Sequence, residues 1–167
     1  FYDDSILEFD TAVGDLLDKL SRAGFSDNTV LVIGSDHGQR YYTNVRIPLI
    51  FHFPDGQAAG TVINGNAQNL DIAPTILDYL NIPIPSWMQG RSLLHNDPGR
   101  RPIISFGITG TIMDRGNKKK KKLVPPFYQF SFIQVIDCDD VFYLNLRKME
   151  WSHDKVKNYS GSCDPGQ

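Results

Sequence analysis

The sequence has few cysteines, no long hydrophobic run and no dominant sign of charge. Its two cysteines, Cys138 and Cys163, form no Cys-x-x-Cys pair of the metal-binding type, and they leave open two free thiols or one disulfide closing a loop of roughly 25 residues. No apolar stretch approaches the roughly 20 residues that a membrane-spanning helix needs. The net charge of −2 gives no overall attraction to nucleic acid or to anionic lipid.

The first residues also lack the features of a secretion signal. The chain does not begin with Met, and Phe1-Tyr2-Asp3-Asp4 has neither a basic start nor an apolar run. We therefore expect a trimmed chain or a piece of a longer protein. The composition, 41% hydrophobic and 22% charged over 167 residues, is that of a soluble globular domain with one core.

The first hundred residues read as alternating helices and strands. Apolar residues recur every three or four positions in 3–22, which predicts an amphipathic helix. The unbroken apolar run in 29–34 predicts a buried strand of a parallel sheet. Further elements are expected as strands at 47–53 and 61–63 and as a helix at 71–80 that Asp71 caps. The fold class is therefore α/β, with part of a mostly parallel sheet flanked by helices.

The rest of the chain reads as a small antiparallel region and a tail. Strands are predicted at 102–106, 129–136 and 141–146, and the last two form a hairpin that turns at Asp139-Asp140. A lysine run, Lys118–Lys122, reads as an exposed loop or as a contact for a polyanion. We expect three parts: an α/β part at 1–100, an antiparallel β region at 101–150 and a loose tail at 151–167.

Asp36-His37-Gly38 follows the first predicted strand, where open α/β sheets bind their ligands. A carboxylate suits hard cations, and an imidazole extends the choice to zinc and manganese. Two ligands are too few for a closed site, so a local reading is also open, in which Asp36 caps the next turn and His37 hydrogen-bonds nearby. The pair is therefore a candidate half of a metal site.

Four segments in order then resemble the sulfatase family, within the alkaline-phosphatase-like superfamily of metal-dependent ester hydrolases. They are "ILEFDTAVGDLLDKLSRAG", "SDNTVLVIGSDHG", "VRIPLIFHFPDG" and "NLDIAPTILDYLNIPIPSWMQGRSLL". The resemblance covers residues 2–94. It implies that Asp36 and His37 match the late Asp-Asn or Asp-His ligands of a divalent cation, most often calcium in sulfatases.

The resemblance also implies parts that this sequence lacks. Sulfatases use a formylglycine nucleophile made from a Cys/Ser-x-Pro/Ala-x-Arg motif, and an early aspartate pair, and neither is found here. We therefore expect the C-terminal portion of a sulfatase-like hydrolase, inactive alone, whose nucleophile lies in a missing N-terminal half. The isolated portion exposes apolar surface meant for that half, so dimerisation or aggregation is expected.

Two other functions stay open. A phosphodiesterase or phosphoglycerol transferase of the same superfamily would use zinc or manganese and a Thr or Ser nucleophile. A non-catalytic domain would use the lysine loop for an anionic partner. The expected partner is a sulfated or phosphorylated ester, with no nucleic acid, because no aromatics interleave the lysine run. Family habit favours a periplasmic or secreted location.

Overall fold

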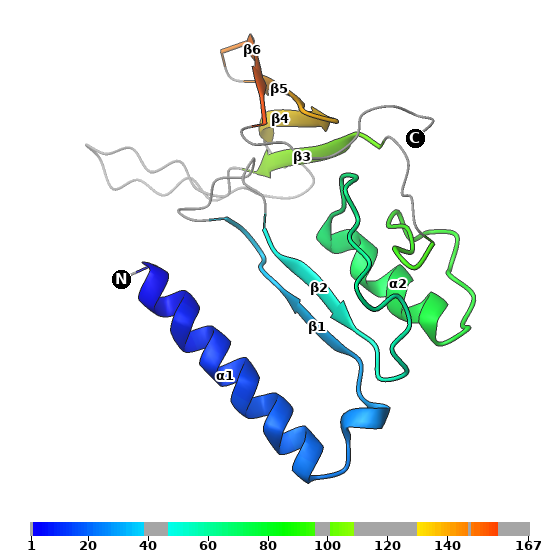
Figure 1. The fold of residues 1–167 in the computed structure, drawn as a ribbon. Helices are drawn as coiled ribbons and strands as arrows, with labels where there is room; N and C mark the ends of the chain where they lie inside the picture. The colour runs from blue at the N-terminus through cyan, green and yellow to red at the C-terminus, as the bar shows by residue number, and fades with distance from the viewer. Residues whose placement is uncertain (1, 39–46, 96–100, 109–129, 147, 157–167) are drawn as a thin grey trace. The chain divides into compact units, whose positions relative to one another are not determined.

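The computed structural model describes residues 2–38, 47–95, 101–108, 130–146 and 148–156 (Figure 1). The elements in chain order are α1 (Tyr2–Arg22), η1 (Ser26–Asn28), β1 (Leu31–Gly34), β2 (Leu49–His52), η3 (Asn69–Asp71), α2 (Ile72–Tyr79), β3 (Ile103–Ile108), β4 (Phe130–Asp137), β5 (Asp140–Asn145) and β6 (Glu150–Lys155). They divide between two compact units, one made of residues 1–35 and 48–61 and the other of 36–47 and 62–167. No helix among the described residues is long and apolar enough to cross a membrane.

The first unit contains α1 and a two-stranded sheet. The predicted helix forms with the expected amphipathic pattern, but none of its residues is buried. Its apolar stripe is open to solvent, with Leu7 67% and Phe9 55% exposed. Strands β1 and β2 pair antiparallel, with Leu31 opposite His52 and Gly34 opposite Leu49.

The mostly parallel sheet expected from the sequence is not found in the described residues, where both sheets are antiparallel. An unbroken apolar run indicates a strand buried on both faces, but it carries no information about strand direction. Parallel neighbours need a crossover that is usually helical, and no helix separates β1 from β2 in the described residues. The strand expected at 61–63 is also absent, and Val62 is 76% exposed.

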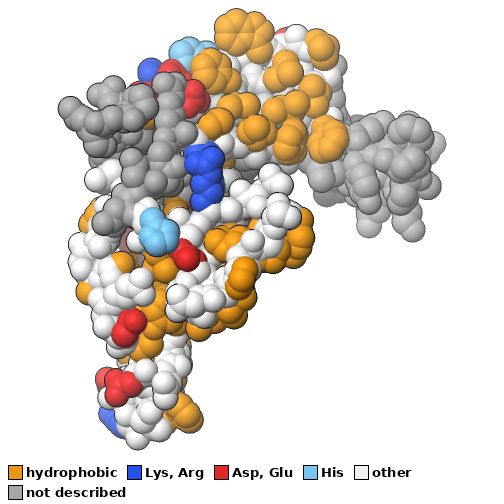
Figure 2. All heavy atoms as spheres, turned by 90° about the vertical axis from the view of Figure 1, so that its right-hand side faces the viewer, with side chains coloured by type: hydrophobic (Ala, Val, Ile, Leu, Met, Phe, Trp, Pro, Cys, Tyr) orange, Lys and Arg blue, Asp and Glu red, His pale blue; other side chains and the backbone are white. Residues whose placement is uncertain are grey.

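The second unit contains a four-stranded sheet of order β3-β4-β5-β6, antiparallel throughout. The predicted hairpin is confirmed, with its two-residue turn at Cys138-Asp139, one position earlier than expected. The tail expected from Trp151 is wrong in its first part, because Glu150–Lys155 forms β6. In Figure 2 hydrophobic side chains gather in the upper part of the view, where Figure 1 places these strands.

Cys138 is the first residue of the β4–β5 turn, and its side chain is buried in the second unit. It is 6% exposed, its φ of 58° is left-handed, and it is disulfide-bonded. Its carbonyl also accepts a hydrogen bond from Asn66 Nδ2 at 3.0 Å. The sequence left free thiols and a disulfide open, and the structure selects the disulfide for Cys138. Cys163, the second cysteine of the sequence, lies outside the described residues.

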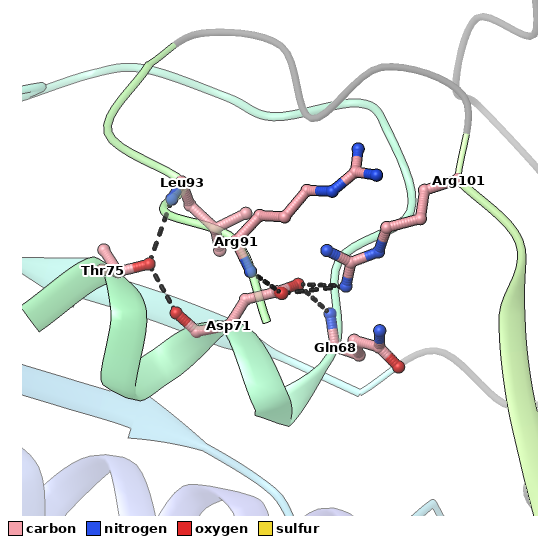
Figure 3. Close-up of polar contacts among 6 residues, drawn as sticks. All are labelled: Gln68, Asp71, Thr75, Arg91, Leu93 and Arg101. Carbon is pink, nitrogen blue, oxygen red and sulfur yellow. Dashed lines mark hydrogen bonds and ion pairs between the residues drawn. The ribbon is translucent and has the colours of Figure 1, made fainter. Parts of the chain in front are cut away.

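The carboxylate of Asp71, fully buried at 0% exposed, ties three parts of the second unit together (Figure 3). Its Oδ2 accepts the backbone N–H of Gln68 at 2.9 Å, and its Oδ1 accepts that of Arg91 at 2.8 Å. Both oxygens accept from Nη2 of Arg101 at 2.8 Å. Asp71 occupies the N-cap position of α2, but its side chain makes no capping bond to that helix. Its carboxylate instead binds the segments before and after α2.

A hydroxyl and a glycine complete this anchor. Thr75 Oγ1 donates to the Asp71 carbonyl at 2.6 Å and accepts from the Leu93 N–H at 3.0 Å. Gly90 passes so close to the Leu70 carbonyl that a Cβ added to it would lie 1.9 Å from that oxygen. Only glycine allows this approach without a backbone shift. The segment around Gly90–Leu93 is therefore held on α2 by contacts that few other residue types could make.

We expect Arg101→Met to lower the free energy of unfolding by about 3–5 kcal/mol, because it leaves a buried carboxylate without its cation. Arg101 is itself only 7% exposed, and its Nε and Nη1 have no hydrogen-bond partner in the described part of the chain. The double change Asp71→Leu with Arg101→Met should therefore cost less than the two single changes together.

Urea denaturation measures these differences. Arg22→Met is the matched control, because Arg22 pairs with Asp18 at 3.8 Å while its side chain is 82% exposed, so its loss should leave stability nearly unchanged. Equal losses for Arg101→Met and Arg22→Met would show that the buried pair is not an anchor.

A thiol assay tests the disulfide. The chain unfolded without reductant should give no reactive thiol, and after reduction it should give two, one for each cysteine in the sequence. A thiol titre near two before reduction would contradict the bonded state of Cys138.

Candidate functional site

Asp36 and His37 follow β1 in sequence, separated from it by Ser35. The ring Nδ1 of His37 lies 2.9 Å from the carbonyl oxygen of Gly38. A carbonyl can only accept a hydrogen bond, so Nδ1 carries the proton when the ring is neutral. The lone pair of the neutral imidazole is then on Nε2. A backbone carbonyl on one ring nitrogen is a common way in which proteins orient a histidine whose other nitrogen binds a metal.

The two side chains present their donor atoms close together. Nε2 of His37 lies 3.5 Å from Oδ2 of Asp36, and the side chains are 43% and 86% exposed. Ligands at about 2.4 Å from one ion and about 90° apart are separated by roughly 3.4 Å. The donor set and spacing therefore fit two ligands of a single divalent cation. The described residues contain no group of three or more potential metal ligands, so the pair would supply only part of a coordination shell.

The lysine run Lys118–Lys122 lies outside the described residues, as do residues 39–46 that follow the Asp36-His37 pair. The two interpretations of the lysine run, an exposed loop or a contact for a polyanion, stay predictions.

The other histidines are placed in three different settings. His52 ends β2 between Phe51 and Phe53, whose rings stack at 5.8 Å. His95 is 82% exposed in its side chain and pairs with Asp78 at 3.1 Å. His153, expected in the tail, lies on β6. None of the three joins the Asp36-His37 pair in a cluster of potential metal ligands within the described ranges.

A second group of charged side chains joins the β4–β5 hairpin to β6. Lys155 Nζ lies 3.0 Å from Asp139 and 2.9 Å from Asp140, while His153 Nε2 lies 2.7 Å from Asp140. Hydrogen bonds from Lys155 and then His153 lower the pKa of Asp140, and hydrogen bonds to Asp140 and Asp139 raise the pKa of Lys155. These contacts join β6 to the hairpin, and they account for the cluster without any bound ligand.

Sequence reasoning missed the buried pair of Asp71 and Arg101. Asp71 was interpreted as a helix cap, and Arg101 was not singled out. The two residues are 30 positions apart, and no local spacing connects them. The sequence feature that could have indicated the pair is Arg101, an arginine directly before the strand predicted at 102–106.

The first half of the chain is similar in sequence to known proteins. The family model for sulfatases matches residues 1–82. The N-acetylglucosamine-6-O-sulfatase of Bacteroides thetaiotaomicron is 35% identical over 101 residues, which cover 53% of this chain and 18% of that protein. The 2,3-bisphosphoglycerate-independent phosphoglycerate mutase of Antithamnion sp. is 38% identical over 78 residues, covering 40% of this chain and 15% of the mutase.

A solved structure shares the fold. It is described as a complex with the substrate D-glucosamine-2-N,6-O-disulfate, and it matches with a TM-score of 0.66 and 23% identity. The match covers 91% of this chain and 32% of that chain. The chain thus spans less than a fifth of the sulfatase relative and about a third of the structural one. Residues 1–82 are thus similar to the sulfatase family, in agreement with the motifs, and the solved structure shows the shared α/β fold.

Proposed function

We propose that this chain is the C-terminal part of a metal-dependent hydrolase of sulfate esters, and that Asp36 and His37 bind its cation. One observation carries the proposal. In a segment that matches the sulfatase family, the Gly38 carbonyl sets the tautomer of His37 so that the lone pair is on Nε2, 3.5 Å from Oδ2 of Asp36. The exposure of both side chains leaves room for an ion between them and for further ligands.

Each residue of the pair has a distinct role in this proposal. Asp36 supplies a negative oxygen that offsets part of the charge of a divalent ion. His37 supplies a neutral nitrogen whose direction the Gly38 carbonyl holds. A bound cation would polarise a sulfuryl oxygen and favour the ionised form of a nucleophile. Calcium is proposed because sulfatases as a family use it, and zinc or manganese belongs to the phosphoester alternative.

The proposal places the nucleophile outside this chain. The sequence holds no Cys/Ser-x-Pro/Ala-x-Arg motif, so no residue here is a candidate for conversion to formylglycine. The small share of the relatives that the chain spans, 18% and 32%, supports a parent protein whose other part carries that residue. The chain alone is then expected to bind metal weakly and to hydrolyse nothing.

A second candidate is the cleavage or transfer of phosphoesters. It is supported by the resemblance to a phosphoglycerate mutase, which covers 40% of this chain. Sulfate-ester and phosphoester enzymes of the alkaline-phosphatase-like superfamily both have the Asp-His pair. The pair therefore does not distinguish the two reactions. A non-catalytic anion-binding domain is the remaining alternative.

We also propose an extracytoplasmic location. The disulfide at Cys138 supports it, because disulfides persist in oxidising compartments and are rare in the cytosol.

The test uses the parent protein and the conservative change Asp36→Asn, which removes the charge and keeps the shape. We expect calcium affinity, measured by titration calorimetry, to fall roughly tenfold or more. A residue that binds the cation directly contributes at least as much to affinity as a residue that only hydrogen-bonds to a ligand. Hydrolysis of an aryl sulfate should fall with it at limiting calcium. Asp55→Asn is the matched control, because exposed Asp55 accepts the N–H of Gln57 at 3.0 Å, which an Asn oxygen can also do.

The readouts separate the candidates. Unchanged calcium affinity in Asp36→Asn would refute the metal role and with it both enzyme functions. Metal-dependent turnover of an aryl phosphate with no turnover of the sulfate would replace sulfate esters by phosphate esters and keep the site.

A further inference from the structure

The β3–β6 sheet has two faces of different composition. Side chains alternate between the faces of a strand, and the pairing register shows which residues share one. One face is mostly apolar: it carries His153 beside Phe142 and otherwise, over its central rows, the apolar residues Ile104, Phe106, Phe130, Ile133, Val135, Phe142, Leu144 and Trp151. The other face carries Ser105, Gln134 and Tyr143 in its central row and Ile103, Phe132, Ile136 and Val141 in the rows beside it. There Gln134 is 3% and Val141 5% exposed, so this second face is covered within the unit over β4 and β5.

The apolar face is open to solvent. Trp151 is 73% exposed, and Ile104, Phe106, Phe130 and Phe142 are 43–54% exposed. Together with the half-buried Ile133, Val135 and Leu144, these side chains present roughly 600 Å² of apolar surface. That area is at the upper end of the largest patch on a typical monomer, about 300–600 Å². It is also most of the about 800 Å² that each partner buries in a standard interface.

The charges beside this face do not oppose its burial against a like surface. Asp140 and Lys155 lie at one end of it, while His153 lies in the row of Val135 and Phe142. Asp140 pairs with His153 at 2.7 Å and with Lys155 at 2.9 Å. The ring of His153 stacks on Phe142 at 4.8 Å. Two copies meeting face to face would therefore not bring unpaired like charges together.

Two other ways of covering this sheet fit less well: a strand added at its edge and a sugar bound on its apolar face. The edge strand β6 carries four titratable residues among its six, a pattern that discourages strand addition. A saccharide needs several polar partners for its hydroxyls, and this face offers few: the ring of His153 is already bonded to Asp140, and beside it stand the indole of Trp151 and aliphatic and phenyl groups.

We propose that the apolar face of β3–β6 is an interface with a second copy of this chain. The two sheets pack face to face about 10 Å apart, around a two-fold axis near Val135 and Phe142, which are paired at the middle of the sheet. This interface is independent of the proposed hydrolase function, because Asp36 and His37 are not part of it.

Sedimentation equilibrium of the 167-residue chain tests the proposal. We expect a reversible monomer–dimer equilibrium, and we expect Trp151→Lys to raise the dimer dissociation constant roughly tenfold or more, because the change removes a large aromatic contact and puts a charge against the apolar face of the partner. Trp87→Lys is the matched control: Trp87 is also 73% exposed but lies in the segment after α2, outside the sheet, and its change should leave the constant unaltered.

Cross-linking locates the axis. A residue near a two-fold axis meets its own copy. Val135→Cys should therefore give a covalent dimer with a short bismaleimide, with the Cys138 disulfide intact. Ser152→Cys, on the opposite face of β6, should give none.

Three results would overturn the proposal. One is a chain that stays monomeric at all concentrations, which would reserve the face for another part of the parent protein. Another is association that Trp151→Lys and Trp87→Lys affect equally, which would place the contact elsewhere, for example on the apolar stripe of α1. The third is equal cross-linking of the two cysteine variants.

Discussion

The buried carboxylate of Asp71 is the interaction on which the second unit depends most. A fully buried charge is unstable unless hydrogen bonds and a counter-charge compensate it, and here two backbone N–H groups and one guanidinium do so. The donors come from the turn before α2, the segment of Gly90–Leu93 and the residue that leads into β3. The carboxylate therefore fixes where three distant pieces of chain meet.

This constraint gives a physical reason for the sequence features that first indicated the family. In "DIAPT" the aspartate is the acceptor at the centre, and the threonine adds a second clamp through Leu93. In "GRSL" the glycine allows the close approach to the Leu70 carbonyl. The most distinctive segment of the resemblance is thus scaffold. It supports membership of the family and says nothing about which ester is bound.

Sequence periodicity predicted the elements that have a strong local pattern. The helix that became α1 and the hairpin of β4 and β5 were found because period and turn chemistry are encoded within a few residues. β6 was missed because Glu150–Lys155 is mostly charged and polar, and it becomes a strand by pairing with β5. Strand direction in the first sheet and the Asp71–Arg101 pair depend on residues far apart in sequence, which no local pattern records.

The candidate site shows the same division. The Asp36-His37 pair could be identified because the two residues are adjacent, and even the tautomer of His37 is set by its neighbour Gly38. The described residues offer no third His, Cys, Asp or Glu beside the pair, so no local pattern among them indicates the other ligands of the proposed cation.

The two-residue turn at Cys138-Asp139 decides more than the end of a hairpin. Because side chains alternate along a strand, lengthening this turn by one residue would shift β5 against β4 by one place and turn β5 over. With β4 held in place by its buried Gln134, Phe142 would then point into the covered side and Tyr143 to solvent. The disulfide and the Asn66 bond to the Cys138 carbonyl hold the turn at its length. Insertions should therefore be rarer in this short connection than in the longer surface links, and its length should be as invariant among close relatives as the residues of the core.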